Sequence, residues 1–192
     1  MSFRRAALAV ASAALLAVSL SSAAMAADPA PAAPAAAAAP AVKPILKRFD
    51  IWTTRCDEDP KTKKPTACHA FVDVRSGEDK RQLLYLGVGY IPNKENELFA
   101  FAVTPLGSIL PPGVGISVDE KEKFGGAYAF CIPMGCQAEM KLTDTELKAL
   151  KSGKAIEIMF RLMGQGVVKV PIELKGFSAA INSLPKQPAK KG

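Results

Sequence analysis

The sequence predicts a mainly β fold, an antiparallel β-sandwich with one or two short helices near the C-terminus. Three observations support this prediction. Short apolar segments, many of them alternating with polar residues, recur between residues 49 and 174. Turn residues separate these segments at close intervals, giving about eight or nine predicted strands. Helical spacing of apolar residues appears only in the last third of the chain. This combination is typical of an antiparallel sandwich.

The segment 124–142 predicts a central β-hairpin. Residues 127–130 are apolar in both phases, which predicts a buried strand, and residues 137–142 alternate as a half-buried strand does. The sequence Pro133-Met134-Gly135 between them favours a tight turn. Cys131 and Cys136 flank this turn, so a disulfide between them would close the neck of the hairpin.

The segments before this hairpin predict further strands. Phe49 begins a strand that runs into Cys56, and a charged loop follows at residues 57–65. Residues 68–74 alternate, with His69 pointing opposite to Cys68. The remaining predicted strands are 83–91 and 98–103, both apolar on two faces, and a short strand at 115–118.

The C-terminal third predicts a helix, a hairpin and a closing helix. Thr143 and Glu146 form a capping-box pattern at the start of a helix that ends near Gly153. Residues 156–162 and 168–174 alternate on either side of Gly164-Gln165-Gly166, and Pro171 places the second strand at a sheet edge. Residues 176–184 carry apolar side chains at helical spacing.

The two ends of the chain predict export and a folded part of ordinary domain size. Residues 1–26 form a signal-peptide pattern: two arginines, an apolar run and the Ala24-Met25-Ala26 cleavage site. We therefore expect a location in the periplasm, on the outer cell surface or outside the cell. Residues 27–44 are an Ala/Pro-rich linker without an apolar face, residues 45–185 are the β-sandwich domain, and residues 186–192 are a basic tail. No segment after the signal peptide is long and apolar enough to span a bilayer.

The charge of the chain is mildly basic. Lys and Arg number 25 and Asp and Glu number 18, and removing two signal-peptide arginines leaves 23 − 18, or +5. Such a bias is compatible with anionic lipid, lipopolysaccharide or acidic glycans, although a soluble surface with a basic tail explains it more simply. Nothing in the sequence resembles a nucleic-acid-binding module, so no nucleic-acid partner is expected.

The four cysteines predict two disulfides in an oxidising compartment. Four cysteines allow three pairings, and we favour the local ones, Cys56–Cys68 and Cys131–Cys136. Structural zinc is the rival use, but neither pair has the close spacing of typical zinc ligands. We therefore predict no metal site.

Few residues suggest catalysis. His69 is the only histidine, and no nucleophile motif accompanies it. Three glutamates, Glu139, Glu157 and Glu173, lie in the polar phase of their strands, which indicates solvated faces rather than paired catalytic carboxylates. No phosphate-binding, dinucleotide-binding or calcium-binding motif occurs, so no cofactor is expected. Four glycines are interpreted as strand and bulge positions: Gly87, Gly89, Gly125 and Gly126.

Several of these features stand in one order along the chain. Ile51-Trp52 leads to Cys56, Cys68 precedes a strand, and Cys131-x-x-x-Gly135-Cys136 is followed by the closing Gly176-Phe177-Ser178-Ala179-Ala180. With Pro105-Leu106-Gly107, Pro112-Gly113-Val114 and the signal peptide, the chain resembles the invasion-associated locus B family of bacterial envelope proteins. The resemblance implies a secreted, non-enzymatic, Ig-like β-sandwich connected with entry into host cells.

The sequence thus favours a secreted, non-catalytic envelope or surface protein that acts by binding. Its partner would be a protein or a component of the envelope or host surface, and the sequence points to no ligand-binding residue and no oligomeric state. Two alternatives remain open at this stage. One is a periplasmic accessory module that supports envelope integrity, and the other is an enzyme with an unrecognised carboxylate site.

Overall fold

The fold is taken from a computed structural model, which describes residues 44–77, 79–90 and 97–186. The predicted signal peptide, residues 27–43 of the linker and residues 187–192 of the tail lie outside this range. The chain divides into two units, 1–39 and 40–192, and all of the described residues belong to the second. This second unit, called the folded unit below, is considered on its own.

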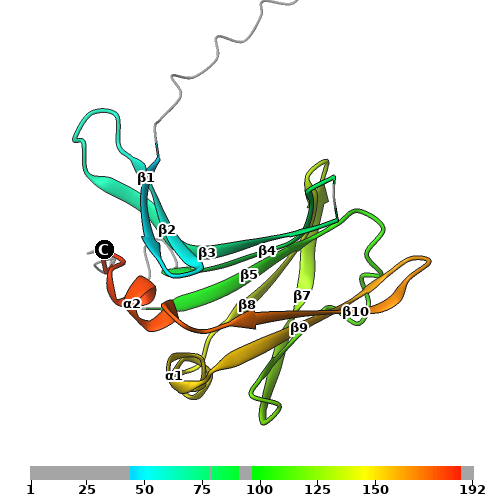
Figure 1. Cartoon of the computed structure of the whole chain (residues 1–192). Coiled ribbons are helices and arrows are strands. Elements are labelled where there is room, and N and C mark those ends of the chain that lie inside the picture. The colour runs from blue at the N-terminus through cyan, green and yellow to red at the C-terminus, as the bar shows by residue number, and fades with distance from the viewer. Residues whose placement is uncertain (1–43, 78, 91–96, 187–192) are drawn as a thin grey trace, which may run out of the picture. The chain divides into compact units, whose positions relative to one another are not determined.

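The folded unit is mainly β (Figure 1). All ten described strands belong to one antiparallel sheet with the order β1-β2-β3-β4-β5-β8-β7-β6-β9-β10. The strands are β1 Ile45–Phe49, β2 Trp52–Glu58, β3 Pro65–Ser76, β4 Arg81–Tyr90, β5 Leu98–Thr104, β6 Val114–Val118, β7 Glu122–Ile132, β8 Gly135–Lys141, β9 Ala155–Leu162 and β10 Gly166–Glu173. The two helices are α1 Asp144–Ser152 and α2 Phe177–Asn182.

The predicted sandwich is not confirmed, because the described strands form one continuous sheet. The long strand β7 explains the continuity. Its first part, 122–126, pairs with β6, and its second part, 127–132, pairs with β8, so β7 joins the two halves of the sheet. A Cβ atom on Gly126 would lie 2.2 Å from the carbonyl oxygen of Glu139, so glycine permits the close approach of the strands at this point.

The sheet encloses one hydrophobic core. Alternate residues of both halves point into it, including Ala70, Ala102 and Ile158, each fully buried or nearly so. The two edges of the sheet meet at Trp52 of β2. Its Nε1 donates a hydrogen bond of 3.0 Å to the carbonyl oxygen of Glu173 at the end of β10. The Trp52 ring also packs edge-on against Phe177 of α2, with centroids 4.8 Å apart. Helix α2 therefore closes one end of the core.

Several local predictions are confirmed. Thr143 caps α1 in a capping box with Glu146, whose carboxylate accepts from the Thr143 backbone N–H at 2.7 Å. The hairpin β9–β10 has the predicted alternation, and Pro171 lies in an edge strand. Both predicted C-terminal helices are present.

Two local predictions need correction. The segment from Phe49 is not one strand, because a tight turn at residues 50–51 separates β1 from β2. Strand β1 was missed because it is an almost wholly exposed edge strand without alternation. The prediction that residues 127–130 are buried is wrong: this part of β7 is exposed or half-exposed, and Phe130 is 46% exposed.

Candidate functional site

Two hairpins, β2–β3 and β7–β8, each contain one pair of cysteines, and their tips lie on opposite sides of the folded unit in Figure 1. The Sγ atoms of Cys56 and Cys68 are 2.06 Å apart, at the neck of β2–β3. Those of Cys131 and Cys136 are 2.02 Å apart, at the neck of β7–β8, where the two residues are direct cross-strand partners. These are the two local pairs that the spacing favoured, and both distances are those of a disulfide bond.

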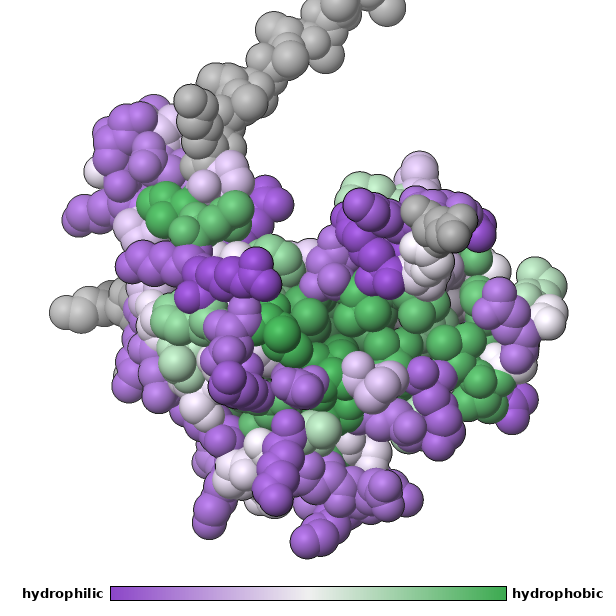
Figure 2. All heavy atoms as spheres, viewed as in Figure 1, coloured by the Kyte–Doolittle hydropathy of each residue, from purple (hydrophilic) through white to green (hydrophobic). Residues whose placement is uncertain are grey.

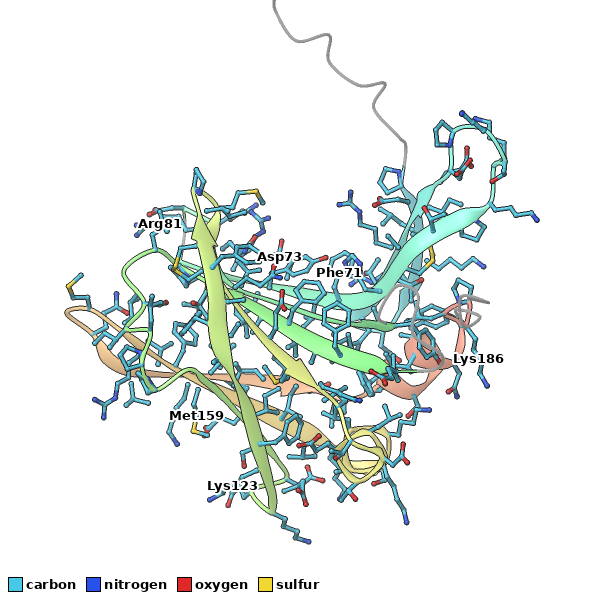
Figure 3. All side chains as sticks on the ribbon, turned by 180° about the vertical axis from the view of Figure 1, so that it is seen from behind. Phe71, Asp73, Arg81, Lys123, Met159 and Lys186 are labelled. Atoms are coloured by element: carbon cyan, nitrogen blue, oxygen red, sulfur yellow. A yellow bond between two sulfur atoms is a disulfide. The ribbon has the colours of Figure 1, made fainter. Side chains whose placement is uncertain are left out.

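Five aromatic rings form a continuous cluster on the outer face of β3, β4 and β5. They come from strand positions that alternate with the core residues, so they point away from the core. Figure 3 shows Phe71 on the side of the sheet turned away from β9 and β10. We call this surface the aromatic face, and its residues are His69, Phe71, Tyr85, Phe99 and Phe101.

The rings contact one another across the three strands. Phe71 stacks on Tyr85 with centroids 4.9 Å apart, and Phe101 lies 5.9 Å from Tyr85 and 5.7 Å from Phe99. His69 meets Phe101 edge-on at 5.4 Å. Stacked and edge-on pairs at these distances add stability beyond their buried area. All five side chains nevertheless remain half-exposed, so no other described element covers them fully.

Glycine makes room for the cluster. Gly87 lies between Phe71 and Phe101 in the register of the sheet, and a Cβ atom there would lie 2.2 Å from Cζ of Phe101. The Phe101 ring therefore covers the backbone of Gly87, and a side chain at this position would displace it. The rings are held in place by the sheet rather than by a flexible loop, which favours a preorganised surface.

A histidine–tyrosine pair gives the aromatic face its polar centre. His69 Nε2 lies 2.7 Å from the Tyr85 hydroxyl oxygen. Burial, and then the nearby Arg55 guanidinium, hold the pKa of His69 below its ordinary value, and burial raises the pKa of the Tyr85 phenol. At neutral pH both side chains are therefore uncharged, and their hydrogen bond is one between neutral groups.

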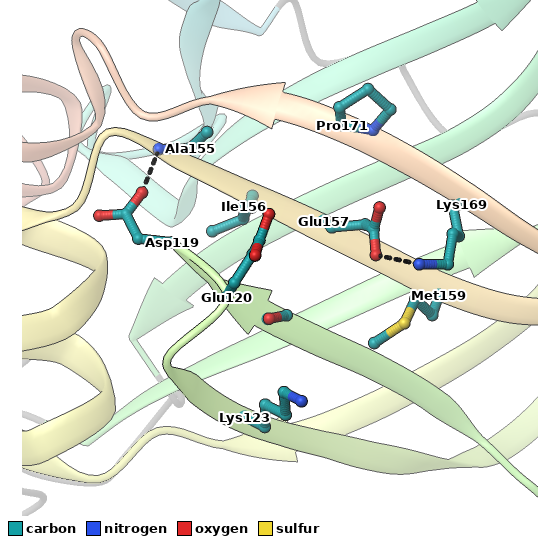
Figure 4. A pocket seen from close by; sticks show the side chains of 10 residues that line it. Asp119, Glu120, Lys123, Ala155, Ile156, Glu157, Met159, Lys169 and Pro171 are labelled. Carbon is teal, nitrogen blue, oxygen red and sulfur yellow. Dashed lines mark hydrogen bonds and ion pairs between the residues drawn. The ribbon is translucent and has the colours of Figure 1, made fainter.

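A second surface feature lies on the other half of the sheet (Figure 4). It is an open depression of about 710 Å³ on β6, β9 and β10. Some of its charged groups are engaged: Glu157 pairs with Lys169 at 2.9 Å, and Asp119 accepts from the backbone N–H groups of Lys154 and Ala155. Glu120 and Lys123 also line it. The Asp119 contacts hold the loops at this edge of the sheet together.

The carboxylates show no arrangement for acid catalysis among the described residues. Glu139 and Glu173 are exposed on their strands, and the half-exposed Glu157 has the lysine partner named above. Backbone hydrogen bonds lower the pKa of the exposed Asp59 and Asp119, whereas a general acid at neutral pH needs a raised pKa. Within the same part of the chain, no three His, Cys, Asp or Glu side chains are grouped to hold a metal ion. No described helix is long and apolar enough to cross a membrane.

Sequence reasoning singled out only His69 of the aromatic face, and it assigned no role to that residue. A signal was nevertheless present, because Phe71 follows His69 by two residues and Phe101 follows Phe99 by two. Gly87 leaves space for the Phe101 ring, and Gly89, in the same phase of β4, leaves space for the Cβ and backbone at His69. What the sequence lacked was the register that places these positions side by side.

Comparisons with known proteins identify relatives of this chain. A family model described as "Invasion associated locus B (IalB) protein" matches residues 52–185. Invasion protein B homologs from two strains of Brucella abortus, 2308 and biovar 1 strain 9-941, are each 24% identical over 137 residues, covering 71% of this chain and 76% of the relative. The crystal structure of invasion associated protein B from Bartonella henselae matches with a TM-score of 0.58 and 20% identity, covering 72% of this chain and 94% of that one. This last likeness shows a common fold.

Proposed function

Because the chain belongs to the invasion associated locus B family, we propose that it is an exported, non-catalytic protein of the envelope or cell surface that acts by binding. We propose further that the aromatic face is its recognition surface. The observation that carries the proposal is the set of five half-exposed, mutually stacked rings on the outside of the sheet.

The chemistry of the aromatic face supports recognition of another macromolecule. Aromatic residues and arginine dominate the energetically important positions of protein interfaces. Here the rings adjoin a rim of charged groups, among them Arg55, paired with Asp57 at 3.5 Å, and Asp73, paired with Arg75 at 2.7 Å. An apolar centre with a polar rim is the usual anatomy of such a surface. The partner would be a protein or another component of the envelope or of a host surface.

Export follows from the signal-peptide pattern of residues 1–26, with residues 27–44 as a linker and residues 45–185 as the exported domain. The cysteines support this route, since the two pairs lie at bonding distance and disulfides persist in oxidising compartments. We expect a mature N-terminus at Ala27, which intact-mass analysis of the exported protein measures. Retention of residues 1–26 in the membrane fraction would contradict this part of the proposal.

The recognition surface is tested with the substitution Phe71→Ser. Binding of the exported protein to intact cells and to isolated envelopes should fall at least about tenfold, because one central aromatic side chain often contributes that much. The control is Met159→Ser, which also changes a half-exposed apolar residue on the outer surface of the sheet, in the depression on the other half. Circular dichroism must show that both variants are folded. Equal binding by the two variants would overturn the assignment of the aromatic face.

A periplasmic accessory role is the second candidate function, and the signal-peptide pattern supports it equally well. Cell fractionation distinguishes the two. Release of the protein or its exposure to added protease on intact cells supports a surface role. Strict retention in the periplasm supports the accessory role, and the aromatic face would then bind an envelope component.

A further inference from the structure

A second surface of the folded unit exposes large apolar side chains. They lie on three connections: residues 105–113 between β5 and β6, the tip of β7–β8, and the tip of β9–β10. Figures 1 and 3 show these connections together at one end of the folded unit, opposite α2. Hydrophobic residues also extend toward this end in the space-filling view (Figure 2). We call this surface the apolar end, and its side chains, each 40–76% exposed, are Leu106, Ile109, Leu110, Phe130, Ile132, Met134, Met163 and Val167.

Hydrogen bonds fix the three connections to one another. The Ile109 backbone N–H donates to the carbonyl oxygen of Arg161 at 2.8 Å, and the Met163 backbone N–H donates to the carbonyl oxygen of Gly107 at 2.9 Å. These two bonds join the 105–113 connection to the β9–β10 hairpin. The apolar side chains of these two connections are therefore presented from one ordered framework.

The buried Thr104 joins the same connection to the β7–β8 hairpin. Its hydroxyl oxygen lies 2.7 Å from the Ser108 hydroxyl and 2.9 Å from the Tyr128 hydroxyl, and it donates to the Cys136 carbonyl at 3.4 Å. Cys136 also lies at bonding distance from Cys131, beside the tip. The exposed tip is therefore held from two sides, and its exposure does not result from fraying.

The three connections of the apolar end carry almost no charge. Residues 105–113 and 129–136 contain no charged side chain, and residues 161–167 contain only Arg161. The turn between β3 and β4, with Asp79 and Lys80, lies at the same end, and Figure 3 places its last cation, Arg81, near the β7–β8 tip. Its partner Asp79 is 3.2 Å away, but both side chains are more than 60% exposed, so this pair is weak. The surface is thus apolar at its tips, with the cations Lys80, Arg81 and Arg161 beside them.

From these observations, we propose that the apolar end inserts shallowly into the surface of a lipid bilayer that carries anionic headgroups. Exposed large apolar side chains that gather at one end of a protein mark an interaction surface. A surface that binds a protein usually presents aromatic side chains and several hydrogen-bonding groups. At the apolar end most exposed side chains are aliphatic or sulfur-containing, and the Ser108 hydroxyl is already engaged within the molecule. Aliphatic tips flanked by cations fit a membrane interface, in which such groups lie about 5–10 Å deep.

The proposal stands on a different surface from the aromatic face and does not require it. Vesicles contain neither proteins nor glycans, so binding to vesicles does not report recognition of a protein or glycan by the aromatic face. The variant Phe71→Ser should bind vesicles as the unchanged chain does. If Phe71→Ser no longer bound cells but still bound vesicles, the lost interaction would be that of the aromatic face alone.

The first experiment measures binding to vesicles by flotation. The protein is isolated as the cell produces it, its N-terminus is determined by mass, and vesicles of phosphatidylcholine are compared with equal mixtures of phosphatidylcholine and phosphatidylglycerol. The double substitution Met134→Glu with Met163→Glu should lower partitioning into the mixed vesicles at least about tenfold, because it places two charges in the apolar layer. Leu46→Glu is the matched control: Leu46 is 57% exposed, but it lies on β1, away from the apolar end. Its effect should be small.

The second experiment reports which residues enter the bilayer. The chain has one tryptophan, Trp52, which is completely buried. In the variant Met134→Trp, the new indole should shift to shorter emission wavelength with mixed vesicles and be quenched by brominated acyl chains. The control Leu46→Trp should do neither.

Three outcomes would overturn the proposal. The first is no binding to mixed vesicles by the unchanged chain. The second is equal loss of binding with the Leu46→Glu control. The third is a concentration-dependent oligomer that the Met134→Glu, Met163→Glu variant abolishes while vesicle binding is absent, which would make a second copy of this chain the occupant of the apolar end.

Discussion

The two cysteine-closed hairpins of the folded unit share a covalent design but differ in the chemistry of their tips. At the end of β2–β3, residues 57–65 are largely charged, and several of their groups pair with one another. Lys63 pairs with Glu58 at 3.3 Å, and the Asp59 carboxylate accepts the backbone N–H groups of Lys61 and Thr62 at 2.9 and 2.7 Å. This tip is a charged, solvated loop that needs no binding partner to cover it.

The β7–β8 tip has no such groups. Its two-residue turn is Pro133-Met134, and Met134 is 76% exposed although nothing in the described chain packs over it. An equally short turn could be built from polar residues at no cost to the hairpin. The difference indicates that the apolar side chains of the second tip serve contacts outside the molecule, whereas the first tip is a solvated loop.

The largest effect on this comparison should come from removing each disulfide. Replacing Cys56 and Cys68 by serine should lower the free energy of unfolding by about 3 kcal/mol, because the closed loop is the longer one, with a sequence separation of 12. Replacing Cys131 and Cys136 should cost about 2 kcal/mol, at a separation of 5. Denaturant titration measures both values, and peptide mapping without reduction identifies the remaining bond. A crossed linkage, such as Cys56 to Cys131, would contradict the pairing on which the comparison depends.

Next in size is the effect of the hydroxyl that joins the second hairpin to its neighbour. Thr104→Val removes contacts to Ser108 and Tyr128 and should lower the free energy of unfolding by about 1–2 kcal/mol. Hydrogen exchange should also rise in residues 105–113. The matched control is Thr66→Val in the first hairpin, where an exposed hydroxyl donates to the backbone carbonyl oxygen of Asp57 at 3.1 Å, and it should cost less than about 0.5 kcal/mol. Similar costs for the two variants would show that the second hairpin is no more firmly held than the first.

Acidification should cause a smaller loss of stability, which depends on the first hairpin and not on the second. His69 follows Cys68 at the root of the first hairpin, whereas no acidic, basic or histidine side chain is present in residues 129–136. The pKa of His69 is lowered in the folded state by burial and by Arg55, relative to an unfolded value of about 6.5. The unfolded chain therefore binds the proton more readily. The stabilisation is fully present above about pH 6.5 and is lost as the pH falls through the folded-state pKa.

Thermal unfolding of the unchanged chain and of His69→Gln tests this effect between about pH 7.5 and pH 5. The unchanged chain should lose more of its midpoint temperature, by a few degrees at most. Both chains have the same carboxylates, so subtracting one midpoint-against-pH curve from the other cancels their contribution. The remaining difference belongs to His69, the only histidine. Parallel curves would show that His69 titrates alike in the folded and unfolded chains.

The sequence predicted most strands because one face of each strand is buried in the core and the other is exposed to solvent. The alternation of Ile156, Ile158 and Phe160 reports that one-sided burial directly, and these residues are buried in the structure. The same rule fails in two ways. Strand β1 is exposed on both faces, so it has no alternation to detect. Residues 127–130 are apolar on both faces, and periodicity does not tell whether a second apolar face meets protein or solvent.

The candidate surfaces were harder to predict than the strands because they depend on register and curvature. Phe71 and Phe101 lie far apart in the sequence and come together only through β4, across Gly87. The single continuous sheet likewise depends on β7 pairing with two different neighbours, a choice made by tertiary contacts. Four cysteines, in contrast, needed only their spacing to suggest the two pairs that the structure places at bonding distance.

The smallest expected effect is the most informative about the second tip. Met134→Lys should change the free energy of unfolding by less than about 0.5 kcal/mol, because the side chain is 76% exposed and packs in no core. Lys63→Met on the first tip should change it by a similarly small amount, since its ion pair with Glu58 is exposed. Denaturant midpoints at unchanged m-value measure both. If Met134→Lys cost more than about 1 kcal/mol, the tip would be packing within the folded unit. Its apolar side chains would then be explained by stability, and the contrast with the charged hairpin would no longer indicate an external contact.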